Sequence, residues 1–88
     1  MTTEHFKQDV WNWAEKIKVS PKEIHIRKMK NKWASCSSKG RLTFDVEVLD
    51  LSPQKRNKII VHELLHLRYP THNKMFHRMM ERYLRGLG

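Results

Sequence analysis

Two histidines and a glutamate within five residues are the side chains of this sequence best suited to chemistry. They form the motif His62-Glu63-Leu64-Leu65-His66. In a helix this spacing places the two imidazoles one turn apart on the same face, with Glu63 beside them. Imidazole is a common zinc ligand, and a carboxylate next to it can serve as a general base. The motif therefore predicts a zinc site with hydrolytic chemistry.

A zinc ion held by two histidines needs a third protein ligand, and a catalytic site leaves the fourth position open. Three later residues could supply it: His72, His77 and Glu81. We favour His72, because Pro70 ends the helix and allows the next loop to turn back toward His66. The competing interpretation is a pair of core histidines that bond to the backbone or to each other and bind no metal.

Hydrophobic periodicity predicts three helices. The first covers about residues 3–18, where apolar residues recur at helical spacing from Phe6 until Ser20-Pro21 ends the pattern. The second covers about residues 53–68 and contains the motif, with Ser52 as its N-cap and proline at its first position. The third follows Pro70 and has an apolar stripe opposite its arginines. The motif helix is apolar around most of its circumference, so we expect it to be buried.

Alternating polar and apolar residues predict strands at 23–27 and 42–48, and a weaker pattern suggests a short strand at 32–37. The order of elements predicts an α+β fold: an N-terminal helix, a three-stranded and mainly antiparallel sheet, the motif helix and a C-terminal helix. We expect residues 1–88 to form one small domain, because the chain is long enough for a single core only.

The composition is that of an ordinary globular chain, with 39% hydrophobic and 31% charged residues. No apolar run approaches the roughly 20 residues that span a bilayer, and the first residues lack the apolar core of a secretory signal. One cysteine, Cys36, excludes an intrachain disulfide and fits a reducing compartment. We therefore expect a cytoplasmic monomer without membrane contact.

The chain is strongly basic, with 18 Lys and Arg against 9 Asp and Glu and a net charge of +9. Such a balance favours polyanionic partners. A nucleic-acid-binding or interaction module with a structural zinc is therefore the alternative to an enzyme. The candidate polyanion contacts lie before the second strand and on the third helix: Lys28, Lys30, Lys32, Arg78, Arg82 and Arg85.

Two segments give the chain a family resemblance. Residues 27–40, which include Trp33-Ala34-Ser35-Cys36-Ser37, resemble the basic lead-in and Trp-Gly-Ser-Cys-Ser segment of the YgjP-like zinc metallopeptidases, also called SprT-like or WLM-related. The motif followed by His72 resembles their H-E-x-x-H-x5-H ligand set. The similarity extends over about residues 13–84, with Ala34 where glycine is usual and Asp45 where asparagine is usual. Members usually carry a longer N-terminal region, so we expect this chain to correspond to the catalytic core.

The resemblance implies a minimal zincin-like core that hydrolyses polypeptides, with one zinc per chain on His62, His66 and His72 and with Glu63 as general base. Groups that could assist the reaction are His77, Arg68, Tyr69 and Tyr83. We expect Trp33 and Cys36 to be core residues. By resemblance, an edge strand near the metal pairs with the substrate, and its residues would be Arg41, Leu42, Thr43, Phe44, Asp45 and Val46.

Overall fold

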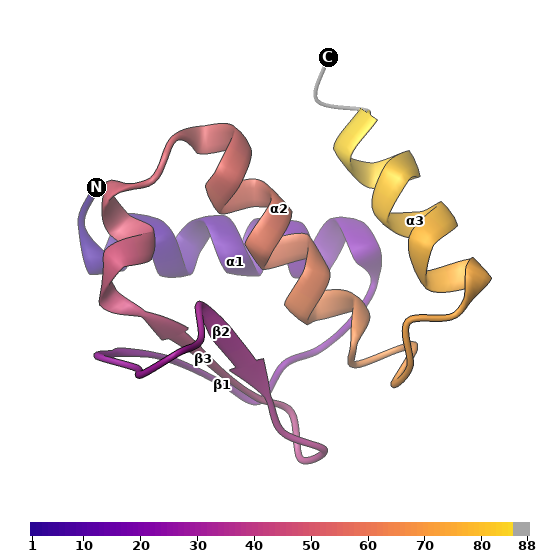
Figure 1. The fold of residues 1–88 in the computed structure, drawn as a ribbon, viewed down its shortest axis with the longest axis horizontal. Coiled ribbons are helices and arrows are strands. Elements are labelled where there is room, and N and C mark those ends of the chain that lie inside the picture. Colours follow the sequence, from indigo (N-terminus) through magenta and orange to yellow (C-terminus); the bar gives the residue numbers. More distant parts are fainter. Residues whose placement is uncertain (86–88) are drawn as a thin grey trace.

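The computed structural model describes residues 1–85 (Figure 1). It confirms the α+β fold and the predicted order of an N-terminal helix, a sheet, the motif helix and a C-terminal helix. A short 3-10 helix, η1, follows the sheet. The elements are α1 (Thr3–Ile17), β1 (Glu23–Arg27), β2 (Ala34–Cys36), β3 (Arg41–Asp45), η1 (Val46–Asp50), α2 (Pro53–Leu65) and α3 (Lys74–Arg85).

The sheet is mixed rather than mainly antiparallel, and its strand order is β1-β3-β2. β1 pairs in parallel with β3, and β2 pairs antiparallel with the same strand. A tight turn at residues 37–40, with Gly40 at a φ of 89°, joins β2 directly to β3. The loop at residues 28–33 separates β1 from β2 and leaves a gap between the two strands. β3 occupies this gap and runs parallel to β1.

The predicted strand at 42–48 ends three residues early, at Asp45. Its carboxylate Oδ2 accepts a hydrogen bond from the Glu47 backbone N–H at 2.9 Å and caps η1 there. The other oxygen accepts from the Met29 N–H at 2.7 Å, and the Asp45 N–H donates to the Trp33 carbonyl at 2.8 Å. Asp45 therefore fixes both the end of β3 and the 28–33 loop. The two N–H donors hold the pKa of its carboxyl below the usual value.

The helix boundaries follow local hydrogen bonds. Thr2 caps the start of α1, and Lys18, in the left-handed conformation with a φ of 65°, caps its end. Ser52 caps α2 ahead of Pro53, as predicted. The motif helix is three residues shorter than predicted, because the N–H groups of His66, Leu67 and Arg68 bond to carbonyls three residues back instead of four. This tighter turn leads into Pro70.

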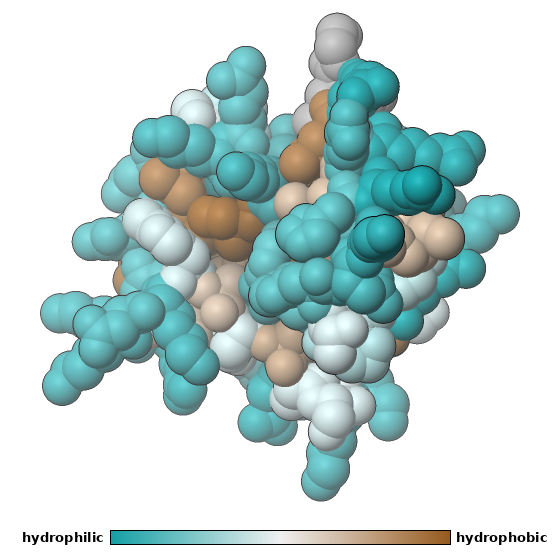
Figure 2. Space-filling view, turned by 45° about the vertical axis from the view of Figure 1, so that its right-hand side comes forward, coloured by the Kyte–Doolittle hydropathy of each residue, from teal (hydrophilic) through white to brown (hydrophobic). Residues whose placement is uncertain are grey.

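The core lies where α1 and α2 pack together on one face of the sheet (Figure 1). Phe6 of α1 and Phe44 of β3 meet there edge to face, with ring centroids 5.0 Å apart. α3 contacts α2 and extends away from the sheet, and Phe76 is its one buried residue among those described. The face in Figure 2 is largely hydrophilic, with small hydrophobic patches between the polar side chains. None of the helices within residues 1–85 is long and apolar enough to span a membrane.

Candidate metal centre

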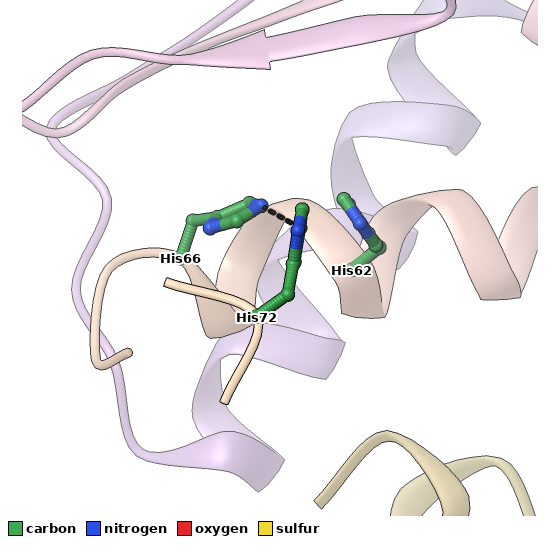
Figure 3. A group of neighbouring side chains, drawn as sticks. All are labelled: His62, His66 and His72. Carbon is green, nitrogen blue, oxygen red and sulfur yellow. Dashed lines mark hydrogen bonds between the residues drawn. The ribbon is translucent and has the colours of Figure 1, made fainter. Parts of the chain in front are cut away.

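Three histidine rings meet at the end of α2 (Figure 3). His62 and His66 come from α2 and its C-cap, and His72 comes from the loop before α3. One nitrogen from each ring lies within 4.8 Å of the others. No other group of three His, Cys, Asp or Glu residues within residues 1–85 has this geometry. These three side chains could hold a metal ion, and they are the three that the sequence favoured.

Hydrogen bonds orient the rings. Nδ1 of His62 lies 2.9 Å from Oε2 of Glu63, a residue that is only 8% exposed. An ionised carboxylate can only accept hydrogen bonds, so His62 donates from Nδ1 and keeps a free lone pair on Nε2. The Nε2 atoms of His66 and His72 are 3.0 Å apart. A cation could take the place of the proton between these two nitrogens and also reach Nε2 of His62.

Asn73 helps to bring His72 to the other two histidines. Its side-chain oxygen accepts a hydrogen bond from the Phe76 backbone N–H at 2.9 Å, which caps α3 one residue after His72. Desolvation lowers the pKa of His72, and the neighbouring His66, His62 and His77 lower it further. The neutral imidazole, which is the form that binds metals, is therefore favoured.

The buried ring of Phe76 packs against all three imidazoles. Its centroid lies 5.2 Å from that of His62, 4.9 Å from that of His66 and 4.8 Å from that of His72. The sequence places Phe76 in the apolar stripe of the third helix, which resembles the family's final helix. In the structure its ring also packs against the three imidazoles and restricts their orientation.

A cleft of about 900 Å³ opens beside the histidines. One wall is β2 with its flanking residues, 32–38, and the other is a face of α2 from Lys58 to Leu67, with Pro70 at its end. His62, Glu63 and His66 all line it. The cleft therefore gives an extended molecule access to the candidate metal ligands and to the buried carboxylate.

The strand that borders this cleft is β2, and this corrects the predicted substrate strand. Arg41–Asp45 form β3, which is bonded on both sides and has no free edge. Val46 lies outside the sheet, in η1. Among residues 1–85, β2 pairs with β3 along one edge only, and its residues Ala34–Cys36 line the cleft. The sequence missed this because the three residues of β2 carry almost no alternating pattern.

Other candidate residues lie outside the group of three histidines. His77 is exposed, and its ring centroid is 6.3 Å from that of His72. Glu81 forms an ion pair with Arg85 on α3. Tyr69 and Tyr83 pack against the core and do not line the cleft. The Arg68 guanidinium donates to the Ile17 carbonyl at 3.2 Å, which turns it toward the end of α1.

Two residues expected in the core line the cleft, and of these Cys36 also packs against the core. Trp33 is 46% exposed, because its carbonyl is tied to Asp45 while its side chain sits at the rim. Cys36 is half-buried on β2, and burial together with the nearby Glu63 carboxylate raises the pKa of its thiol. The raised pKa keeps Cys36 protonated at neutral pH.

The predicted polyanion contacts form two separate groups. The lysines lie on the 28–33 loop and the arginines on α3, and these segments are on opposite sides of the molecule in Figure 1. All six side chains are exposed, and Lys32 also lines the cleft. They do not make one continuous surface.

Comparisons with known proteins agree with the fold and with the histidine cluster. The family model described as YgjP-like, metallopeptidase domain, matches residues 1–87. The chain therefore belongs to the YgjP-like metallopeptidase family, and the match covers the whole of α1, of which the sequence resemblance reached only the last residues. The chain is also similar to the crystal structure of the metallopeptidase zymogen of Pyrococcus abyssi abylysin. The two are 29% identical over 86% of this chain and 76% of that one, with a TM-score of 0.77. No curated protein matches the chain.

Proposed function

We propose that this chain is a zinc-dependent endopeptidase that binds one zinc through His62, His66 and His72 and uses Glu63 as its general base. The observation that carries the proposal is the convergence of three imidazole nitrogens within 4.8 Å beside a buried carboxylate. Membership of a metallopeptidase family supports a metal and a polypeptide substrate.

The donor set fits zinc. Imidazoles are among its preferred ligands, and structural or catalytic sites hold them at about 2.0–2.1 Å in tetrahedral geometry. Two nitrogens at that distance from one ion are roughly 3.3 Å apart. The 3.0 Å between Nε2 of His66 and Nε2 of His72 is close to that value. Three neutral ligands also suit a hydrolytic site, because they leave the charge of the ion undiminished.

The chain's own residues would then carry out the proton transfers. When bound, zinc supplies Lewis acidity, which lowers the pKa of water and polarises a carbonyl. Glu63 would accept a proton from the attacking water and deliver it to the leaving amine. His62 holds the Glu63 carboxylate in position through the 2.9 Å hydrogen bond. Burial of Glu63 keeps competing bulk water away from this carboxylate.

We place the substrate along β2. The free edge of this strand faces the cleft, so an extended polypeptide can add to the sheet through backbone hydrogen bonds. The scissile bond would lie where β2 faces His62 and Glu63. Recognition through the backbone suits an endopeptidase that accepts unfolded chains.

The substitution Glu63→Gln tests the proposal. Glutamine has nearly the same shape as glutamate and lacks a basic carboxylate, so we expect the variant to retain one zinc per chain. Cleavage of an unfolded protein should fall by a factor of about 10²–10⁴, the usual contribution of a general base. Zinc content and cleavage are measured on the same samples. Undiminished cleavage by zinc-loaded Glu63→Gln, or no cleavage by the zinc-loaded wild type, would contradict the proposal.

A further inference from the structure

The charged residues that line the cleft are mainly basic. Lys32 and Lys58 line it, and Glu63 is the one acidic residue among the described lining residues. Neither lysine takes part in any of the ion pairs found within residues 1–85. With a dication on the histidines, the positive charges of the cleft would outnumber its one negative charge. Its electrostatics therefore favour a negatively charged occupant.

Both lysines lie at the same end of the cleft. Lys32 precedes β2, and Lys58 precedes His62 by one turn on the same face of α2. β2 and α2 run in the same direction across Figure 1, so the starts of the two elements lie at one end. Trp33 and Ile59 follow the two lysines along the walls. This end combines two free cations with apolar side chains.

The position of Lys32 is fixed by backbone hydrogen bonds. The Trp33 carbonyl accepts from the Asp45 N–H at 2.8 Å, and the Met29 N–H donates to the Asp45 carboxylate at 2.7 Å. Lys58 is held by the regular backbone of α2. The backbone that carries each lysine therefore has a defined place relative to the candidate metal ligands, while both side chains are exposed.

We infer that Lys32 and Lys58 form a subsite for an acidic side chain of the polypeptide substrate. The inference rests on the proposed function and specifies its substrate class. One helical turn between Lys58 and His62 corresponds to a rise of about 6 Å, the length of roughly two residues of extended chain. The acidic residue should therefore lie about two or three positions from the scissile bond, on one side only.

An acidic polypeptide fits the cleft better than a nucleic acid does. The free edge of β2 offers backbone hydrogen-bonding groups that an extended peptide can match and a sugar-phosphate chain cannot. The predicted polyanion contacts lie on the 28–33 loop and on α3, which are on opposite sides of the molecule in Figure 1, so these residues do not form one track for a phosphate backbone through the cleft.

A position scan tests the subsite in turnover. Quenched fluorescent peptides share one cleavable sequence, and a single Glu, or Gln as the neutral control, is placed at each of the three positions before and after the scissile bond. We expect kcat/KM to be about fivefold higher for Glu than for Gln at the second or third position on one side. Salt near 0.5 M should reduce this preference by screening. A flat profile would overturn the inference and leave the proposed function intact.

Three variants locate the preference. Lys32→Gln and Lys58→Gln should each lower the Glu-to-Gln ratio by about two- to threefold and leave cleavage of the Gln peptide within about twofold. The matched control is Lys55→Gln, which removes the same charge from an exposed position of α2 that does not line the cleft. It should leave the ratio unchanged. An equal loss in Lys55→Gln would assign the effect to net charge and overturn the subsite.

A binding measurement separates the inference from catalysis. Fluorescence anisotropy of a labelled peptide on zinc-loaded Glu63→Gln should show tighter binding of the Glu than of the Gln version, and this difference should shrink in Lys32→Gln and Lys58→Gln. This result would support the subsite even if no peptide is cleaved. The absence of cleavage would refute the proposed function and leave the subsite intact. If a single-stranded oligonucleotide binds more tightly than the acidic peptide and depends equally on both lysines, the cleft is a nucleic-acid site and the inference is wrong.

Discussion

Phe76 shows how one apolar side chain can organise a polar site. The three imidazoles come from two segments, and each of them touches its ring. The ring is 1% exposed, so it has little freedom to move. Because rotation of an imidazole would have to displace Phe76, the ring reduces the conformational freedom that the histidines lose on binding a metal.

We predict that Phe76→Leu lowers zinc affinity by roughly tenfold, the lower end of the effects that supporting groups have on metal sites. Leucine stays apolar and lacks the flat ring against which the three imidazoles pack. Affinity is measured by competition with a chromophoric chelator at neutral pH. Phe6→Leu is the matched control, because Phe6 is equally buried but packs against Phe44 on the sheet. It should lower stability and leave zinc affinity unchanged; equal losses of affinity in the two variants would contradict a specific role for Phe76.

The three histidines that come together were predicted from the sequence. The prediction was possible because their spacing determines which of them can lie close together. His62 and His66 must share a helix face, and the position of Pro70 made a return of the chain at His72 reasonable. The places of Trp33 and Phe76 depend on contacts between segments far apart in the chain. Both are aromatic residues, for which burial in the core is the ordinary expectation, and only Phe76 meets it.

Asp45 joins three elements. It ends β3, caps η1 and anchors the loop that leads to Trp33 and β2. Each carboxylate oxygen accepts one backbone N–H, so the residue at this place needs two acceptors. The wall of the cleft formed by residues 32–38 therefore depends on a side chain that does not itself line the cleft.

We predict that Asp45→Asn lowers the melting temperature by on the order of 5 °C at neutral pH. Asparagine offers one acceptor oxygen, so one of the two N–H groups faces an amide NH₂ instead. Its exposed counterpart on η1, Asp50→Asn, is the control and should change little. The measurement is thermal unfolding followed by circular dichroism. Unchanged melting in Asp45→Asn would show that the two hydrogen bonds do not stabilise the fold.

The same variant should change the acid sensitivity of the fold. The folded pKa of Asp45 is lowered, so its contribution is complete above the unfolded pKa near 3.9 and is lost as the pH falls through the lower folded value. The difference in melting temperature between wild type and Asp45→Asn should therefore shrink as the pH falls from about 5 to about 2. A difference that stays constant over this range would contradict the assignment.

At the scale of elements, periodicity predicted the helices and β1 well because each has a long or regular pattern. The end of β3 could not be read in the same way. Val46 and Val48 continue its alternation, and the strand ends because Asp45 captures the Glu47 N–H. The parallel pairing of β1 with β3 was missed for a related reason, since it depends on where a long loop takes the chain.

The whole molecule is small, and its third helix packs against the core mostly through partly buried residues. α3 contributes one buried residue, Phe76, and the loop before it carries His72. A metal bound to His62, His66 and His72 would link α2 to this loop and so hold α3 against the body. In a single core of this size, such a link should make a large difference to stability.

We therefore predict that removing zinc lowers the melting temperature by on the order of 10–20 °C. Ligand at 100 times its Kd adds about 2.7 kcal/mol to the free energy of unfolding, and each kcal/mol corresponds to about 4–8 °C in a domain of 60–100 residues. Calorimetry of the zinc-loaded and EDTA-treated chain measures the difference. His72→Ala should abolish it, whereas His77→Ala, whose ring stands outside the cluster, should preserve it. Equal melting temperatures with and without zinc in the wild type, or the reverse pattern in the two variants, would refute the metal link and the choice of His72 as third ligand.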